Sequence, residues 1–293
     1  MSSAKSLTLR LMTVADLNFA NALREVIGWN QTPNDWRRLL THEPDGCFVA
    51  EWNGSPAGTA TTTCYGTELA WIGMVLVHPH YRRRGIGKAL LDRCLTFLSG
   101  RRVRCIKLDA TPLGKPLYEQ LGFREEWPLT RWQINLINAP SLSDVLAPEP
   151  SVRAWRSSDA AQVAEFDRTI FGVSRERMLE SLARESCRAL IHTSANGEIT
   201  GHGMQREGSK ASYLGPVVAS AVEAGTALIN ALLLQTRTQT IYWDIPDSNL
   251  AATFLAKQRG FTPQRSLLRM FLGSNETPGQ PGCCFGIADP AMG

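Results

Sequence analysis

The spacing of apolar residues along the chain predicts strands that alternate with helices. Short apolar runs typical of strands lie at 7–11, 47–52, 57–65 and 69–77. Segment 86–98 instead has apolar residues every three or four positions, as an amphipathic helix does. Because the two patterns alternate, we expect an α/β fold, an α+β mixed sheet flanked by helices.

Capping and turn signals mark where these elements begin and end. Thr32, followed by Pro33 and Asp35, is a helix start signal, because the hydroxyl caps free backbone N–H groups and proline fits the first turn. Asn53-Gly54 between two strand patterns predicts a tight hairpin.

The first half of the pattern closes and the second half then repeats it. After a strand and a short helix, two closing strands are expected at 123–127 and 132–137. The Pro-rich segment 139–150 is typical of a linker. We therefore expect two tandem domains, 1–138 and 151–293, joined by that linker.

A second shared signal supports the internal repeat. Gly122-Phe123 ends the short helix of the first half, and Gly260-Phe261 ends the matching helix of the second half. A glycine at this position stops a helix because it readily adopts the left-handed conformation.

The segment 75–88 reads VLVHPHYRRRGIGK and joins a strand end, a basic glycine loop and a helix start. Amides at a helix N-terminus and arginine side chains both bind phosphate oxygens, and glycine lets the backbone approach them. We therefore expect a diphosphate to bind at Arg82, Arg83, Arg84, Gly85, Ile86, Gly87 and Lys88.

Two other phosphate-binding loops fit this segment poorly. A P-loop requires Ser or Thr after its Gly-Lys, and the chain has Ala89 there. A dinucleotide fingerprint requires a third glycine, and Leu90 stands at that position.

The loop and a downstream motif together resemble one family. Arg-x-x-Gly-x-Gly at 82–87 and Tyr-x-x-x-Gly-Phe at 118–123 resemble the GNAT N-acetyltransferase superfamily. The arrangement of both halves resembles tandem GNAT proteins whose C-terminal domain is degenerate. That resemblance implies two GNAT-like domains, each a twisted mixed sheet flanked by helices, with acetyl-CoA as the acyl donor and no metal.

The resemblance also implies roles for individual residues. Backbone groups of Met74, Val75, Leu76 and Val77 would hold the pantetheine like an added strand, and Tyr118 would return a proton to the departing thiolate. A phenol with pKa ~10 stays protonated near neutral pH, so Tyr118 can donate as thiolate charge builds.

A base must also remove a proton from the ammonium group of the acceptor. Asp109 at a strand end and Glu68 before the central strand are the candidates, with Asp109 better placed. The alternative role of Asp109, capping the Thr111-Pro112 turn, fits the sequence equally well.

The first helical region is where GNAT substrates usually enter. Trp29, Asn30 and Trp36 are candidate pocket residues there, and Tyr65 and Glu68 are further candidates. A pocket lined by Trp and Asp would suit a cationic, partly apolar amine, although a Trp in a capped helix is more often part of the core.

The second half lacks the residues that the family mechanism needs. Aligning the two Gly-Phe pairs puts Ala256 where Tyr118 stands. The stretch matching the basic loop, 219–225, has no arginine and carries Glu223, which would repel a diphosphate. We therefore expect no acyl transfer by the second half.

Composition narrows the function classes. The 293 residues carry a net charge of +4, 43% are hydrophobic and 20% charged, which is typical of a globular protein and too weakly basic to indicate a nucleic-acid binder. Seven cysteines without a Cys-x-x-Cys pair favour free thiols in a reducing compartment. No apolar stretch has the length of a signal or a membrane span, so we expect a cytoplasmic protein.

These observations predict an acetyl-CoA-dependent N-acetyltransferase that acts on a primary amine of a small molecule by direct attack in a ternary complex. The alternative is a non-catalytic acyl-CoA-binding or sensor protein, which would keep the loop without needing Tyr118. We expect no nucleic-acid, membrane or metal partner, because His78 and His80 lack an accompanying Cys, Asp or Glu cluster. A homodimer is left open.

Overall fold

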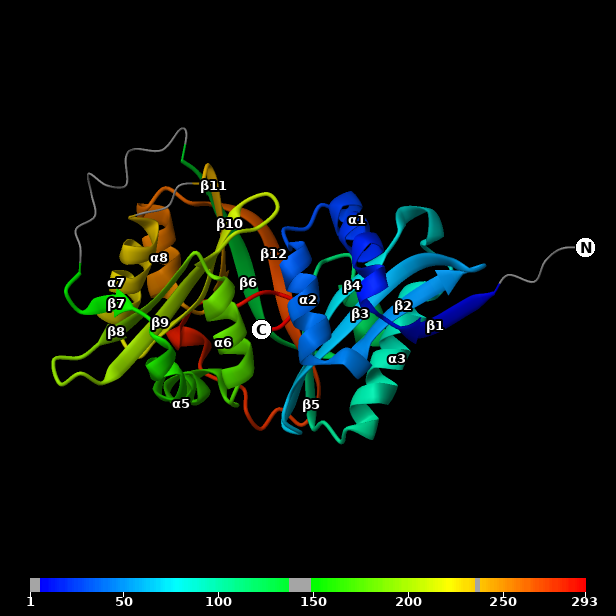
Figure 1. Ribbon diagram of the computed structural model, residues 1–293, viewed down its shortest axis with the longest axis horizontal. Helices are drawn as coiled ribbons and strands as arrows, with labels where there is room; N and C mark the ends of the chain where they lie inside the picture. Colours follow the sequence, from blue (N-terminus) through cyan, green and yellow to red (C-terminus); the bar gives the residue numbers. More distant parts are fainter. Residues whose placement is uncertain (1–5, 137–148, 235–237) are drawn as a thin grey trace, which may run out of the picture.

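The computed structural model describes residues 6–136, 149–234 and 238–293. In the first half, the order of elements is β1 (Leu7–Leu11), α1 (Leu17–Ile27), α2 (Pro33–His42), β2 (Cys47–Trp52), β3 (Ser55–Tyr65), β4 (Leu69–Val77), α3 (Ile86–Gly100), β5 (Cys105–Ala110), α4 (Lys115–Gln120) and β6 (Arg124–Asn135). The predicted mixed α/β fold is confirmed (Figure 1).

The second half repeats this order and adds one short strand. Its elements are β7 (Val152–Ala154), α5 (Ala160–Phe171), α6 (Glu176–Glu185), β8 (Arg188–Thr193), β9 (Ile199–Arg206), β10 (Ser212–Ala219), α7 (Val222–Leu233), β11 (Thr240–Pro246), α8 (Leu250–Gln258), β12 (Thr262–Gly273) and β13 (Cys284–Gly286). The linker predicted at 139–150 lies, apart from its last two residues, outside the described residues.

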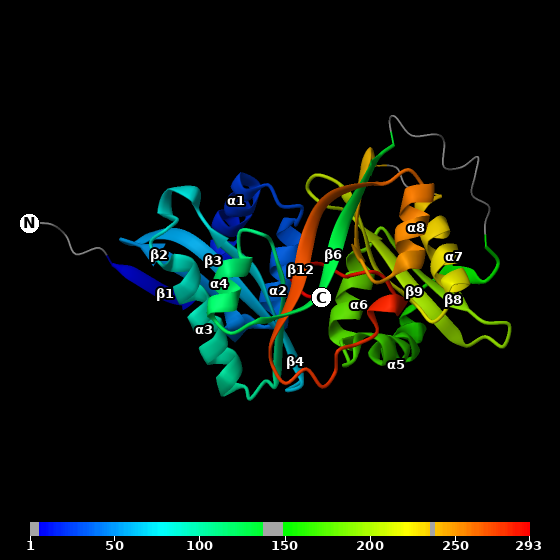
Figure 2. The ribbon, with the colours of Figure 1, turned by 180° about the vertical axis from the view of Figure 1, so that it is seen from behind.

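The described strands form one continuous sheet because the two halves exchange their last long strands. The order is β1-β2-β3-β4-β5-β12-β6-β11-β10-β9-β8-β7, with β13 beside β10. Strand β12 of the second half pairs with β5 of the first, and β6 of the first half pairs with β11 of the second. Figure 2 shows β6 and β12 side by side between the halves.

The prediction of two closing strands at 123–127 and 132–137 is wrong. They form a single strand, β6, that continues through Pro128. Strand β11 pairs with β6 only from Leu129 to Asn135, so Pro128 lies just outside that ladder and its missing N–H is tolerated there. The second closing strand of the first half is supplied by β12 instead.

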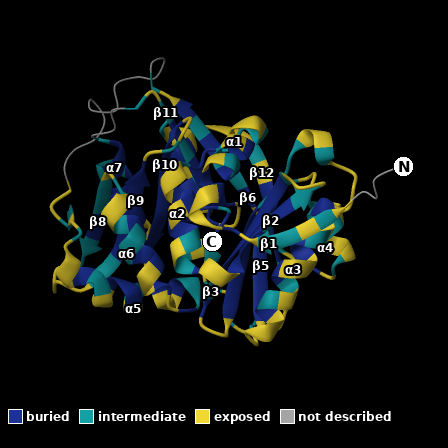
Figure 3. Ribbon diagram, turned by 45° about the vertical axis from the view of Figure 1, so that its right-hand side comes forward, coloured by how far each residue is buried: buried dark blue, intermediate teal, exposed yellow. Residues whose placement is uncertain are grey.

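Helices cover both faces of the sheet, and the strands between them are buried (Figure 3). On one face, α3 packs its Leu90, Leu91 and Cys94 on the first-half strands. On the other face, α1 and α2 share one core with α6 of the second half, where Trp36 lies in the same cluster as Met178. The two halves therefore share a core as well as a sheet.

A buried ion pair joins the exchanged strand β6 to β11. Nε of Arg131 donates to Oδ1 of Asp244 at 2.7 Å, and the two residues lie opposite each other in the ladder. Both side chains are almost completely buried, and the Tyr213 hydroxyl donates a further bond to Asp244.

We expect Arg131→Met to lower the free energy of unfolding by about 3–5 kcal/mol, because it leaves the Asp244 carboxylate buried without its cation. Urea unfolding followed by tryptophan fluorescence measures the change. The double variant Arg131→Met/Asp244→Leu is the control and should recover most of the loss, since no charge remains buried. A loss under 1 kcal/mol in the single variant would show that the pair does not hold the strands together.

Candidate active site

Strands β4 and β5 separate after a short paired stretch. They pair in parallel only where Leu69–Trp71 meets Cys105–Lys107. The ladder between β3 and β4 shifts register nearby, and Met74 has a positive φ of 48°. The hydroxyl of Thr59 donates to the Met74 carbonyl at 2.9 Å and holds this bulge. The bulge turns β4 away from β5 and opens a cleft between them.

The predicted phosphate loop lies at the far end of β4. Gly85 caps helix α3 with a φ of 78°, a left-handed conformation that glycine adopts readily. Arg82, Arg83 and Arg84 are exposed around it, and the first N–H groups of α3 are directed into the loop. Lys88 pairs with Asp92 at 2.7 Å, so part of its charge is already neutralised.

We name the opening at the bulge the β4 cleft; it has about 420 Å³ of empty space, including its mouth. The first half contributes residues that the sequence singled out, namely Trp29, Met74, Val75, Asp109 and Tyr118. The whole lining comes from six separate segments, which the fold brings together: 29–31, 72–75, 108–111, 118, 265–267 and 290–291.

Tyr118 reaches the cleft from α4. Its ring packs against Phe123 with 6.0 Å between ring centroids, and a Cβ at Gly114 would lie 2.8 Å from the ring, so glycine makes room for it. Burial raises the pKa of Tyr118 to about 12. The hydroxyl is therefore protonated across the neutral range.

Asp109 lies in the cleft wall with its carboxylate engaged. Its two oxygens accept bonds from Nε and Nη2 of Arg269 on β12, at 2.8 and 2.9 Å. The side chain has no exposed surface, and burial raises its pKa while the guanidinium opposes the rise. The sequence also allowed Asp109 to cap the Thr111-Pro112 turn. That turn is closed instead by the Thr111 hydroxyl, which accepts a hydrogen bond from the Gly114 N–H.

The structure places four other candidates outside the β4 cleft. Trp36 is fully buried in the core beneath α2. The amide of Asn30 holds the loop before β10 through Ala211, and the Tyr65 hydroxyl donates to the Met292 carbonyl at 2.7 Å. Glu68 is exposed in the turn at the opposite end of β4 from the bulge.

The second half contributes residues to the cleft that the sequence did not single out. Arg265 comes from β12, and Pro290 and Ala291 from the last described segment. A Cβ at Gly73 would lie 2.4 Å from the Ala291 carbonyl oxygen, so this segment lies directly on β4. Gln31 was missed as well, although its place beside Trp29 and Asn30 was a usable signal.

The corresponding opening of the second half is filled by its own chain. Strand β10 pairs with β11 only over Ser212–Leu214 and then shifts register, as β4 does. Strand β13 pairs with Val217 and Val218 beyond that shift. The Phe285 ring packs onto Gly225 of α7, where a Cβ would lie 2.3 Å from the ring. A pantetheine therefore finds no free strand edge there.

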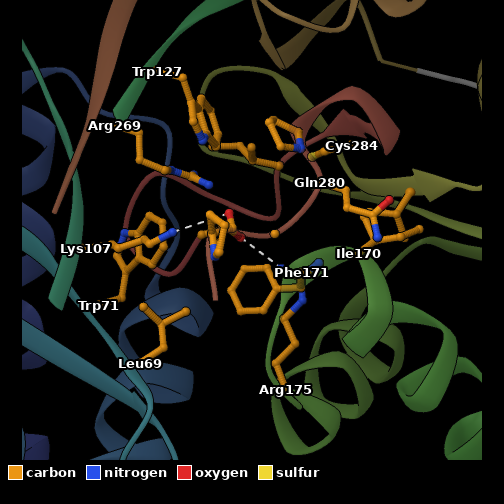
Figure 4. Close-up of a pocket in the computed structure, with 16 residues that line it drawn as sticks. Leu69, Trp71, Lys107, Trp127, Ile170, Phe171, Arg175, Arg269, Gln280 and Cys284 are labelled. Atoms are coloured by element: carbon orange, nitrogen blue, oxygen red, sulfur yellow. Dashed lines mark hydrogen bonds between the residues drawn. The ribbon is translucent and has the colours of Figure 1, made fainter. Parts of the chain in front are cut away.

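A second pocket lies between the halves and is lined by residues of both (Figure 4). The Arg269 guanidinium lies between the rings of Trp71 and Trp127, 4.3 and 4.0 Å from their centroids. Lys107 pairs with Glu126 at 2.7 Å, so the cations of this pocket have carboxylate partners. The pocket is a packed junction between the halves.

The described residues contain no group of three or more His, Cys, Asp or Glu side chains that could hold a metal ion. Within the same residues, no helix is long and apolar enough to cross a membrane.

Comparison with known proteins identifies the family. Residues 18–123 match the model of the "Acetyltransferase (GNAT) family", and residues 163–286 match the model of the "Acetyltransferase (GNAT) domain". The acetyltransferase SG1711 of Sodalis glossinidius is 34% identical over 102 residues, which are 32% of this chain and 68% of that protein. The chain belongs to the GNAT acetyltransferase family. It carries two GNAT domains in tandem.

Similarity to other GNAT proteins extends along most of the chain. YitH of Bacillus subtilis, an uncharacterized N-acetyltransferase, is 24% identical and shares 77% of each chain. MJ1207 of Methanocaldococcus jannaschii, also an uncharacterized N-acetyltransferase, is 29% identical over 44% of this chain and 65% of its own.

Solved structures show the same tandem arrangement. A candidate acetyltransferase from Pyrococcus horikoshii matches with a TM-score of 0.82 at 26% identity, over 98% of this chain and 96% of its own. A tandem GNAT protein from the clavulanic acid biosynthesis pathway matches with a TM-score of 0.65 at 16% identity, over 92% and 98% of the two chains, and so shares the fold.

Proposed function

We propose that this GNAT protein transfers an acetyl group from acetyl-CoA to a primary amine of a small molecule, by direct attack in a ternary complex. The observation that carries the proposal is the β4 cleft. In it, the Met74 bulge, the open edge of β4 and the Tyr118 hydroxyl meet, and the α3 N-terminus lies at the far end of β4. The β4 cleft would act mainly by positioning the two reactants and by stabilising the charge that develops between them.

The chain offers a matching group for each part of acetyl-CoA. Strand β4 has no partner strand on its β5 side beyond Trp71, so backbone groups of 72–77 can pair with the amides of pantetheine. The loop amides and the exposed side chains of Arg82–84 would hold the diphosphate. Tyr118 would donate its proton to the sulfur as thiolate charge develops.

Asp109 is the proposed base, because it is the only carboxylate among the described residues that line the β4 cleft. It also has a structural role. Asp244 makes the same kind of buried pair with Arg131 in the second half, where the cleft is filled. Proton acceptance by Asp109 is therefore an additional role that needs its own test.

Calorimetric titration should show one acetyl-CoA bound per chain, because β13 occupies the second opening. Arg84→Glu/Gly87→Asp should weaken binding by about tenfold or more, since it removes a charge-assisted contact and adds two negative charges beside the diphosphate. The control Arg102→Glu makes a similar charge change at the other end of α3 and should bind normally. Two acetyl-CoA molecules per chain would contradict the filled second cleft, and no binding would contradict the proposed function.

Tyr118→Phe should lower kcat by about 100-fold with little change in acetyl-CoA affinity, because it removes only the proton donor. Thiol release during steady-state turnover gives kcat, and calorimetry gives the affinity. Tyr242→Phe, on a half-exposed tyrosine of β11, is the control and should keep full activity. If the wild type binds acetyl-CoA but acetylates no amine, the protein is an acyl-CoA-binding or sensor protein instead.

Asp109→Asn tests the base through its pH profile. A carboxylate base must be ionised, so wild-type kcat/KM should fall as the pH drops through the raised pKa of Asp109. In Asp109→Asn the fall of kcat/KM that follows the pKa of Asp109 should disappear. The rate should then rise with pH only as the amine itself loses its proton. Asp244→Asn disturbs the equivalent pair outside the cleft and should keep the wild-type profile. An unchanged profile in Asp109→Asn would assign Asp109 a purely structural role.

A further inference from the structure

We propose that the acceptor amine also carries an anionic group, a carboxylate or a phosphate, which Arg265 binds. The inference rests on the proposed function, because it names the substrate class of the same cleft. Arg265 lines the β4 cleft from β12, together with Met74 and Tyr118 of the first half. None of the loop residues 82–88 lines this cleft, so the Arg265 guanidinium is separate from the proposed diphosphate site.

Arg265 differs from the other sheltered arginines around it. Its Nε atom is buried and has no hydrogen-bond partner, and the described residues offer it no carboxylate within ion-pair distance. Arg269, four residues along the same strand, binds both oxygens of Asp109. Arg131, opposite Arg265 in the sheet, binds both oxygens of Asp244. Arg265 is thus a half-buried cation without a carboxylate partner among the described residues.

The nearest carboxylates already have other partners. Asp244 is held by Arg131 and by the Tyr213 hydroxyl. Asp289 accepts bonds from the Gln31 amide at 3.0 and 3.1 Å and from the Ala291 N–H at 2.8 Å. Burial and the positive charge of Arg131 lower the pKa of Arg265, and Asp244 and Asp289, which form no ion pair with it, oppose that shift without reversing it.

An anionic group on the substrate would supply the missing partner. A guanidinium presents its N–H groups in a planar fork that matches carboxylate and phosphate oxygens, and such charge-assisted bonds are among the strongest in proteins. In a sheltered cleft this attraction is less screened than at the surface. Arg265 would therefore favour an anionic acceptor over a neutral or cationic one.

Gln31 supplies a second recognition point. Its side chain is buried, and its Nε2 donates to Asp289, which fixes the orientation of the amide. Its Oε1 has no partner and belongs to the lining of the cleft. A free amide oxygen accepts a bond from an N–H group, so Gln31 suits the amine of the acceptor while Arg265 suits the anion.

The rest of the acceptor side is apolar, with Trp29, Leu267 and Pro290 in its wall. A small amine with an anionic group thus meets the Gln31 oxygen, the Arg265 cation and apolar surface beside the Asp109 carboxylate. The proposal replaces the cationic acceptor suggested by Trp and Asp of the first helical region. Asp35 of that region pairs with Arg38 and does not line the cleft, whereas Arg265 brings a positive charge to it.

The test compares paired amines that differ in one anionic group. Leucine is paired with 3-methylbutylamine, and phosphoethanolamine with ethanolamine. Their kcat/KM values with saturating acetyl-CoA are measured by thiol release for the wild type, Arg265→Met, Arg265→Lys and Arg124→Met. Arg124, an exposed arginine on β6, is the matched control for loss of a positive charge.

We expect the anionic member of at least one pair to be preferred by about tenfold or more in the wild type and in Arg124→Met. The leucine and phosphoethanolamine pairs distinguish a carboxylate from a phosphate. Arg265→Met should abolish the preference, and Arg265→Lys should restore part of it, because the charge returns without the fork. The melting temperature of Arg265→Met should stay the same or rise, since no protein partner is lost; a purely structural arginine would lower it.

Faster turnover of 3-methylbutylamine and ethanolamine, or an unchanged preference in Arg265→Met, would overturn the inference and leave the acetyltransferase proposal standing. If acetyl-CoA binds and no amine reacts, calorimetric titration of leucine and phosphoethanolamine decides, and binding of neither overturns the inference. Weaker acetyl-CoA binding in Arg265→Met would also overturn it, because Arg265 would then serve the donor. Failure of acetyl-CoA to bind the wild type refutes the proposed function separately.

Discussion

The exchange of β6 and β12 between the halves is the constraint on which the rest of this structure depends. Two equivalent buried ion pairs hold it in place. Asp109 on β5 binds Arg269 on β12, and Asp244 on β11 binds Arg131 on β6. Each pair joins the strand before the exchange in one half to the last long strand of the other. Breaking either pair leaves a buried charge without its partner, which is strongly destabilising. Ion pairs as well as backbone hydrogen bonds therefore hold the two halves together.

The exchange makes the β4 cleft a product of both halves. Strand β12 closes the first-half sheet and carries Arg265 into the cleft. After β12 the chain returns to the second half, where β13 fills the opening beside β10, and then crosses to cover Gly73 with Ala291. The second half thus fills its own opening beside β10 and provides a wall for the cleft of the first.

The local parts of this arrangement could be read from the sequence. The β4 pattern, the Gly85 turn and the start of α3 rest on residues within a few positions of each other, and the structure has them where the sequence predicts. Pro128 is a position where local residue patterns give the wrong prediction. A proline inside a strand pattern indicates a break, and only the position of β11 explains why β6 runs through it.

Residue patterns alone identified the family, the tandem repeat, and the absence from the second half of the basic glycine loop and the tyrosine motif of the first. They could do so because each of these features depends on residues close together in the chain. Only the folded chain shows which strands pair across the halves, that Arg269 binds Asp109, and that Asn30 and Tyr65 brace the interior. It also shows that Arg265 lines the cleft with no carboxylate partner among the described residues. The hydrogen bonds of Asp109, Asn30 and Tyr65 join residues 160 to 227 positions apart. Apolar periodicity specifies which face of an element is buried but not which distant element covers it.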